Sequence, residues 1–512
     1  MTVWYHQEFR KNRLFRYKLV DWPEKVKRSH ENGPAIAEKI KVEYDRPPVS
    51  PKSRRIRSRR MPELPNDVLE HVFRLLPIKQ AVRAGLVSRR FKQVWLFSRM
   101  LHFGRWFTTH HGILEAVSII DRVFRAHAGP QIQSFKLYID PTDIEAMVRK
   151  WIEISISKGV EELELNFIAA RVEPFELSRD LIDVESLRVL KLTFCEIDIP
   201  PNLTSLHLLD TLILKKVEIT AEMVETLILN CTLLATLELV RCDAIGQLKL
   251  SAQNHKRFKV LKVGDCSDLS LIEINAPSLR TFHFYGLVPL FLFEEISQLK
   301  DVVLNFVPTK GFMRHSFVRN IVDDLARVSV LTVNSIFLEG ISPNYEDLKH
   351  NMHGLPFWYR NLKEFQLIMQ GGVYCNTYDI AAFLSNCPMI EKVFIDLNDC
   401  SFEGSIYWEL HQKQEIESFG FLCCLKFVKV KGFRFQQHEH ELVKFFLHKA
   451  INLDALALVS ARNRLYPKCY SEFIERYQKY FQWQSSARAI MTFSNDCKDD
   501  TTHPTHQKIW QA

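Results

Sequence analysis

A short apolar pattern that recurs thirteen times limits the folding of this 512-residue chain more than any other feature. Each copy reads apolar-x-x-apolar-x-apolar, and successive copies start 20 to 35 residues apart. The last two apolar positions of a copy are two residues apart, so they share one face of a short strand. The copies are IQSFKL (132–137), VEELEL (160–165), LRVLKL (187–192), LDTLIL (209–214), LATLEL (234–239), FKVLKV (258–263), LRTFHF (279–284), LKDVVL (299–304), VSVLTV (328–333), LKEFQL (362–367), IEKVFI (390–395), LKFVKV (425–430) and LDALAL (453–458).

One copy of this pattern cannot fold alone. Its three apolar side chains contribute ~1.5–3 kcal/mol each when they are buried. Ordering the backbone of roughly 25 residues costs ~1–2 kcal/mol per residue. Neighbouring copies must therefore share a core, which predicts a curved solenoid with a broad concave face. The x positions of the strands would line that face, and they include Lys191, Glu238, Lys262, His283, Gln366 and Phe394.

The pattern is that of leucine-rich repeats with an irregular period. Its extension to x-x-[Cys/Asn] is present at Cys195, Cys242, Cys266 and Asn398. The apolar segments 223–229 and 380–385 predict helices on the convex side, and each is followed by Asn-Cys just before the next strand. The alternative, a β-sandwich, needs alternation along longer strands and regular hairpin turns, which the sequence lacks.

Residues 61–101 form a dense helical segment ahead of the repeats. Pro77 ends a first helix, whose apolar stripe consists of Val68, Leu69, Val72, Phe73 and Leu76. A second short helix carries Val82 and Leu86, and Ser88 is the expected N-cap of a third. Three helices in ~40 residues cannot bury all of this apolar surface, so we expect another structure to cover part of it.

The helical segment resembles the F-box of plant proteins, with Phe91 at a position where tryptophan is commoner. The resemblance implies docking to a Skp-type adaptor and, through it, to a cullin. An unrelated three-helix bundle is the alternative. The matching positions that we expect to form or support the adaptor surface are Leu64, Pro65, Val68, Leu69, Leu76, Pro77, Ile78, Val82, Val87, Ser88, Arg90, Phe91 and Trp95.

Two stretches near the end of the chain, CLKFVKVKGFRFQQHEHELVKFFLHKAINLDALAL (424–458) and KYFQWQSSARAIMTF (479–493), resemble the FBD region of plant F-box proteins. The expected fold is therefore α/β, with a small helical F-box followed by an irregular, horseshoe-like leucine-rich-repeat solenoid. The predicted parts are a basic arm at 1–60, the F-box at 61–105, the solenoid at 106–415, the FBD-like end at 416–493 and a polar tail at 494–512.

The net charge of +8 is concentrated in the basic arm. Residues 1–60 hold 17 Lys and Arg against 7 Asp and Glu, whereas residues 61–512 hold 51 against 53. A nearly neutral body argues against a groove that follows nucleic-acid phosphates, so we expect no nucleic-acid partner there. The arm ends in a cluster that is either a nuclear-import or phosphate-binding patch or a solvated linker, namely Arg54, Arg55, Arg57, Arg59 and Arg60.

The motifs of enzymes are missing from the sequence. There is no glycine-rich phosphate loop, and in HEHELVKFFLH (438–448) Lys444 stands where a zinc helix needs its second histidine. We therefore expect no enzymatic activity, no cofactor and no metal. No run reaches the ~20 apolar residues that span a bilayer, so we expect no membrane partner. No secretory signal follows Met1, and the 11 scattered cysteines indicate reduced thiols, so we expect the nucleus, the cytoplasm or both.

The resemblances imply a substrate-recognition subunit of a Skp–cullin–F-box ubiquitin ligase. The alternative is a repeat protein that binds nucleic acid or a scaffold through the basic arm, without ligase assembly. The long repeat units predict that an unknown protein target is selected on the concave face and on loops within 334–361 and 396–424. Candidate target contacts are Phe357, Trp358 and Tyr359, unless these aromatic side chains fill the widened unit.

Overall fold

The computed structural model divides the chain into two compact units, Met1–Glu63 and Leu64–Ala512. The first unit, with the predicted arginine cluster, lies outside the described residues. The described residues are 78–87, 94–169, 173–181, 184–199, 205–307, 321–341, 358–369, 377–397, 419–460, 489–495 and 499–507, with Pro65, Val68, His71, Val72, Leu76, Val318, Glu417, Glu475 and Lys479.

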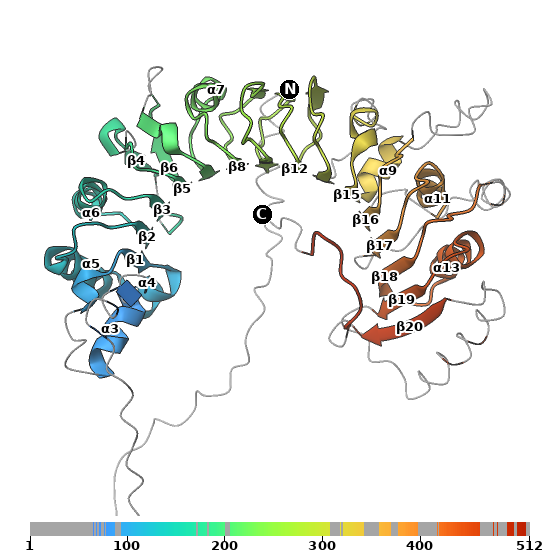
Figure 1. The fold of residues 1–512 in the computed structure, drawn as a ribbon, viewed down its shortest axis with the longest axis horizontal. Coiled ribbons are helices and arrows are strands. Elements are labelled where there is room, and N and C mark those ends of the chain that lie inside the picture. The colour runs from blue at the N-terminus through green and yellow to red at the C-terminus, as the bar shows by residue number, and fades with distance from the viewer. Residues whose placement is uncertain are drawn as a thin grey trace, which may run out of the picture. The chain divides into compact units, whose positions relative to one another are not determined.

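One parallel sheet of fifteen strands organises the second unit (Figure 1). Every one of the thirteen sequence repeats supplies a strand that starts two residues into its pattern, so the predicted solenoid is confirmed. In spatial order the strands are β1 (Met100–Phe103), β2 (Ser134–Tyr138), β3 (Glu162–Asn166), β5 (Val189–Thr193), β7 (Thr211–Lys215), β8 (Thr236–Val240), β10 (Val260–Gly264), β12 (Thr281–Gly286), β14 (Asp301–Phe306), β15 (Val330–Asn334), β16 (Glu364–Ile368), β17 (Lys392–Asp396), β18 (Phe427–Phe433), β19 (Ala455–Ser460) and β20 (Ile490–Asn495).

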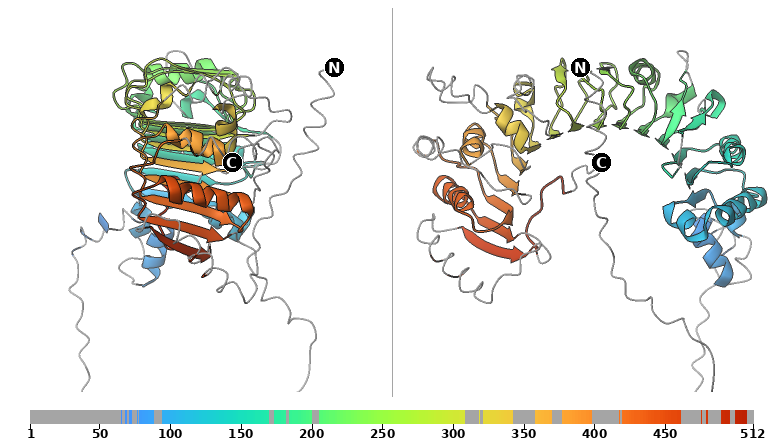
Figure 2. Two further views of the ribbon diagram at one scale, coloured as in Figure 1. Left: turned by 90° about the vertical axis from the view of Figure 1, so that its right-hand side faces the viewer. Right: turned by 180° about the vertical axis from the view of Figure 1, so that it is seen from behind.

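The helices of the solenoid cover one face of this sheet, which we call the outer face, and the opposite face is the inner face (Figure 2). The apolar strand positions, such as Leu190 and Leu192 of β5, are buried beneath the outer layer. The predicted convex helices at 223–229 and 380–385 are confirmed as parts of α7 and α11. The helices of this layer are α5 (Ile113–Ala126), α6 (Glu145–Ser157), α7 (Ala221–Asn230), α9 (Ser335–Ile341), α11 (Thr377–Ser385) and α13 (Gln437–Lys449).

Short strands take the place of helices in two parts of the outer layer. Strands β9 (Gln247–Ser251), β11 (Leu271–Asn275) and β13 (Leu290–Phe293) form a parallel three-stranded sheet, and β4 (Phe175–Leu177) pairs with β6 (Cys195–Ile197). A strand rises about 3.3 Å per residue against 1.5 Å for a helix. The repeats that hold β9, β11 and β13 span only 20 to 24 residues, which favours an extended chain for the return across the sheet.

A left-handed residue follows each of four central inner strands. Phe194, Lys216, Arg241 and Asp265 have φ angles between 52° and 60°. The amide of Lys216, for example, donates to the carbonyl of Val240 on the next strand at 2.8 Å. The predicted cysteine positions come directly after three of these turns, and Cys195, Cys242 and Cys266 are buried. Asn398 lies outside the described residues.

Replacing Lys216 by glycine should stabilise the fold, because a side chain in the left-handed region costs ~1–2 kcal/mol while glycine loses ~0.5–1 kcal/mol of backbone entropy. We expect the free energy of unfolding, measured by chemical denaturation, to rise by up to about 1 kcal/mol. The control is Lys215→Gly in β7, which should lower it. A loss of stability in Lys216→Gly equal to that of the control would contradict this account of the turn.

The two predicted target-selecting loops, within 334–361 and 396–424, are described only in part. Residues 335–341, predicted within a target-selecting loop, instead form the short helix α9, which is buried except for the half-buried Glu339. The remainder of the loop at 342–357, and most of the loop at 396–424, lie outside the described residues. Across the described part of the chain, no helix combines the length and the apolar composition needed to cross a bilayer.

Candidate functional site

The helical segment ahead of the sheet exposes several apolar side chains. Val68, Val72 and Val82 are 41%, 46% and 39% exposed, and Val82 lies on helix α3 (Ile78–Val87). Ile78 is buried in the core, which suits a supporting position, and the hydroxyl of Ser98 donates to the carbonyl of Leu76 at 2.9 Å. These contacts join the segment to the start of the sheet while part of its apolar surface faces outward.

The other predicted adaptor residues are described only in part. Pro65 is exposed, and Leu76 and Trp95 are half-buried. Val87 ends α3, but its side chain is not described. Those outside the described residues are Leu64, Leu69, Pro77, Ser88, Arg90 and Phe91.

An exposed tryptophan that sequence reasoning missed lies beside this segment. Trp106 belongs to α4 (Arg105–His111) and is 55% exposed. The ammonium group of Lys79, on α3, lies 3.3 Å from the centre of the Trp106 ring, and His110 stacks on the ring at 4.8 Å. A cation held over an aromatic face links α3 to α4. Little in the sequence distinguishes Trp106, because it comes after the F-box positions and before the first copy of the repeat pattern.

One row of side chains crosses the inner face, with one residue in register from each of the twelve strands of the large sheet from β2 to β18. All six residues that the repeat pattern assigned to the concave face lie in this row, so that prediction is confirmed. The row runs Lys136, Glu164, Lys191, Ile213, Glu238, Lys262, His283, Val303, Thr332, Gln366, Phe394 and Lys429.

The first half of the inner face carries alternating charges. Lys136 lies 2.7 Å from Glu162 and 3.4 Å from Glu164, and Lys191 reaches both carboxylates at 3.8 and 3.6 Å. Burial alone would raise the pKa of Glu162, but hydrogen bonds from Lys136 and Ser134 outweigh it and hold that pKa below its usual value. Because these lysines are paired with carboxylates, this described part of the inner face lacks a continuous row of unpaired basic side chains that could bind phosphates.

The C-terminal segment 499–507 lies on the second half of the inner face (Figure 1). The ammonium group of Lys429 lies 2.5 Å from a carboxylate oxygen of Asp499, and the two side chains are 5% and 6% exposed. Farther along, the amide of Thr505 donates to Glu364 at 2.6 Å. The sequence predicted only a polar tail here, and this segment is thus part of the surface assigned to target binding.

A small cavity remains where this segment crosses strands β16 to β18. Its volume is about 130 Å³. Gln366, Phe394 and Lys431 line it from the sheet, while His503 and Pro504 line it from the C-terminal segment. Such a mixed polar and aromatic lining suits an extended peptide side chain or ordered water better than a large apolar ligand.

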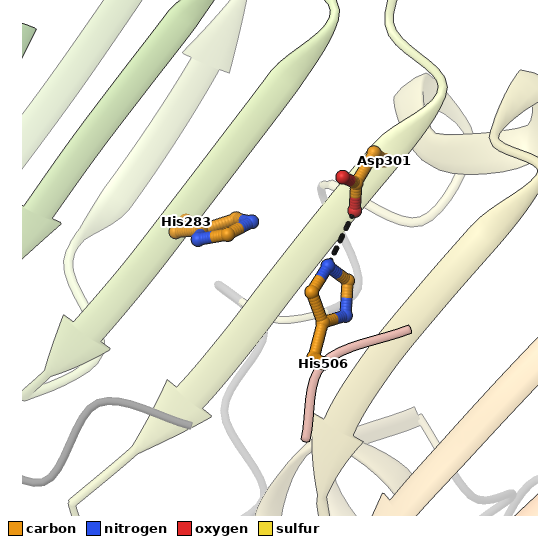
Figure 3. A group of neighbouring side chains, drawn as sticks. All are labelled: His283, Asp301 and His506. Atoms are coloured by element: carbon orange, nitrogen blue, oxygen red, sulfur yellow. Dashed lines mark ion pairs between the residues drawn. The ribbon is translucent and has the colours of Figure 1, made fainter. Parts of the chain in front are cut away.

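Two histidines and an aspartate meet at the centre of the inner face (Figure 3). His283 comes from β12, Asp301 from the start of β14 and His506 from the C-terminal segment. Desolvation lowers the pKa of His283 to about 4, although the charge of Asp301 opposes this shift.

The predicted target contacts separate into buried and exposed residues. Tyr359 is completely buried, with its ring 5.2 Å from that of Phe383, so its prediction as a target contact is wrong. It fills the widened repeat, which is the alternative that the sequence left open. Trp358 is 54% exposed, and its role stays a prediction. Phe357 lies outside the described residues.

Comparison with known proteins gives the same organisation. Residues 61–102 match the F-box domain family, and residues 123–494 match the leucine-rich-repeat domain of the At1g61320/AtMIF1 type. A putative FBD-associated F-box protein from Arabidopsis thaliana, At1g61330, is 33% identical over 78% of this chain and 91% of its own length. The FBD-associated F-box protein At1g61320 from the same plant is 32% identical over 78% of this chain and 88% of its own. With an F-box ahead of this repeat domain, the chain belongs to the FBD-associated F-box proteins.

Proposed function

We propose that this protein is the substrate-recognition subunit of a Skp–cullin–F-box ubiquitin ligase. The match of residues 61–102 to the F-box family carries the proposal, because F-box domains generally bind Skp-type adaptors. Val68, Val72 and Val82 give that segment an exposed apolar surface of the kind that a partner buries. Through the adaptor, the chain would join a cullin.

In this role the protein acts by proximity and carries out no bond chemistry itself. The inner face and exposed residues outside it such as Trp358 would hold the target, while the ligase and its conjugating enzyme transfer ubiquitin. Holding two reactants in one complex raises their effective concentration, so no catalytic residue is required of this chain. We further propose that the protein works in the nucleus, the cytoplasm or both, with the arginine cluster at 54–60 as a candidate import signal.

Adaptor binding tests the proposal directly. Replacing both Leu64 and Pro65 by alanine should weaken binding of a purified Skp-type adaptor by ~2 kcal/mol or more, which is about 30-fold in dissociation constant. Val82→Lys, which places a charge on the exposed face of α3, should act in the same direction. Both effects are measured by titration calorimetry.

A surface change of the same kind, far from the F-box, is the matched control. Leu229→Lys alters an exposed leucine of α7, 65% accessible to solvent, and should leave the dissociation constant unchanged. Adaptor binding that survives the F-box variants, or that Leu229→Lys weakens to the same extent, would exclude the proposed docking surface.

A further inference from the structure

The three side chains at the centre of the inner face come from segments far apart in the chain. The potential ligand atoms of His283, Asp301 and His506 all lie within 4.8 Å of one another. Thr281 of β12 pairs with Asp301 of β14, so His283 lies two residues along the neighbouring strand and on the same face. The ring of His506 meets that of His283 edge-on at 5.1 Å between centres.

A polar contact with the sheet holds one ring nitrogen of His506. Nδ1 lies 2.7 Å from the hydroxyl of Thr332, and this hydroxyl lies 3.2 Å from the side-chain oxygen of Gln366. In the tautomer in which Nδ1 donates to Thr332, Nε2 carries the lone pair on the side of Asp301. Metal-binding histidines are held by such a hydrogen bond from the nitrogen that does not bind the ion.

The other ring nitrogen of His506 forms a close pair with Asp301. Nε2 of His506 lies 2.8 Å from Oδ1 of Asp301, yet this close pair lacks the alignment of a hydrogen bond. Nε2 of His283 is buried close by, and it also makes no hydrogen bond to a described residue. Two imidazole nitrogens and a carboxylate oxygen from three half-buried side chains converge here, and this set of ligand atoms favours a cation between them.

We propose that His283, Asp301 and His506 bind a zinc ion, which fastens the C-terminal segment to the inner face. Zinc accepts imidazole and carboxylate ligands at about 2.0–2.2 Å, so the three atoms, which lie within 4.8 Å of one another, would draw closer together around one ion. Calcium and magnesium prefer sites made of oxygen alone. A solvent molecule would complete the four ligands, as in zinc sites with three protein ligands.

Zinc binding and docking of the C-terminal segment are then linked. Residue His506 supplies one ligand and the sheet supplies two, so the site is complete only while residues 499–507 are docked. An ion that binds the docked state alone stabilises that state by mass action. Zinc would therefore determine how long this segment covers the inner face. The sequence predicted no metal because the ligands show no local spacing.

Titration of the metal-free full-length chain with zinc chloride tests the site. The wild type should bind one ion here, and Asp301→Asn should bind it at least about tenfold more weakly, because a neutral amide keeps the shape but is a poorer ligand than a carboxylate. His506→Ala and His283→Ala should also lose the site. His503→Ala, which removes a histidine of the same segment outside the cluster, should bind zinc like the wild type.

Hydrogen exchange gives a second measurement, which reports on the segment itself. Zinc should slow amide exchange at residues 499–507 in the wild type and in His503→Ala, but not in Asp301→Asn or His506→Ala. Cobalt substitution should show nitrogen and oxygen ligands without a sulfur-to-metal charge-transfer band. The proposal would be overturned by no zinc binding at micromolar concentrations, by undiminished binding in Asp301→Asn, or by a sulfur band that assigns the ion to cysteines.

Discussion

Replacing Trp151 by alanine should lower the free energy of unfolding by about 3–5 kcal/mol, because a large buried side chain leaves a cavity that its neighbours fill only in part. Trp151 is completely buried on α6. Its ring stacks 6.2 Å from that of Phe124 on α5, which meets Phe135 of β2 edge-on at 5.2 Å. The loss would thus fall on the layer that joins two helices to the first strands of the sheet.

The damage should be local, because each repeat of a solenoid contacts mainly its neighbours. We expect faster hydrogen exchange in β1 to β3 of Trp151→Ala, while β16 to β19 keep the protection of the wild type. Trp106→Ala, a change of the same residue type on exposed α4, should cost no more than about 1 kcal/mol. Equal losses in the two variants, or a loss of protection spread evenly over all strands, would contradict this picture.

The strands and the inner-face residues were predictable because they depend on local spacing. The pattern apolar-x-x-apolar-x-apolar places thirteen of the fifteen strands of the large sheet, and the parity of a strand then determines which side chains face inward, as with Lys262 and Gln366. The buried cysteines follow from the same register, since they come at fixed offsets after the strands. Burial raises the pKa of Cys242 to about 12 and that of Cys266 to about 11, so both remain protonated thiols at neutral pH.

The docked C-terminal segment could not be predicted from local patterns. His506 contacts Thr332 across 174 positions of the sequence, and Thr505 contacts Glu364 across 141. A segment held by single polar contacts shows no apolar period, so it reads as a solvated tail. Tyr359 was misassigned for a related reason: three adjacent aromatic residues do not reveal from the sequence which of them points into the core.

Replacing Lys429 by methionine should release the C-terminal segment from the inner face. The substitution keeps the length of the side chain but leaves Asp499 as a buried charge without its partner, which costs about 3–5 kcal/mol when the surroundings cannot change. The ammonium group also donates to the carbonyl of Thr502 at 3.2 Å. Because residues 499–507 can leave the sheet and regain water, the segment should undock while the solenoid stays folded.

Exchange of the amides of residues 499–507 should therefore become fast in Lys429→Met, while the melting temperature changes little. Lys431→Met is the matched control, since Lys431 lies two residues away on the same strand, is 42% exposed and faces Asp396 at 3.7 Å. An exposed pair of this kind contributes no more than about 1 kcal/mol, so the control should keep the segment docked. Slow exchange of residues 499–507 in Lys429→Met, or equally fast exchange in the control, would show that the buried pair does not hold the segment.

Release of the segment has a consequence for target binding. If a target binds the second half of the inner face, it must compete with residues 499–507. Its apparent affinity is then the intrinsic affinity multiplied by the fraction of molecules whose inner face is open. Lys429→Met and a chain that ends before residue 499 should then both bind the target more tightly, by about the same factor. The truncated chain keeps Lys429, so it separates loss of competition from loss of a contact. Weaker binding by both variants would instead make residues 499–507 part of the target-binding surface itself.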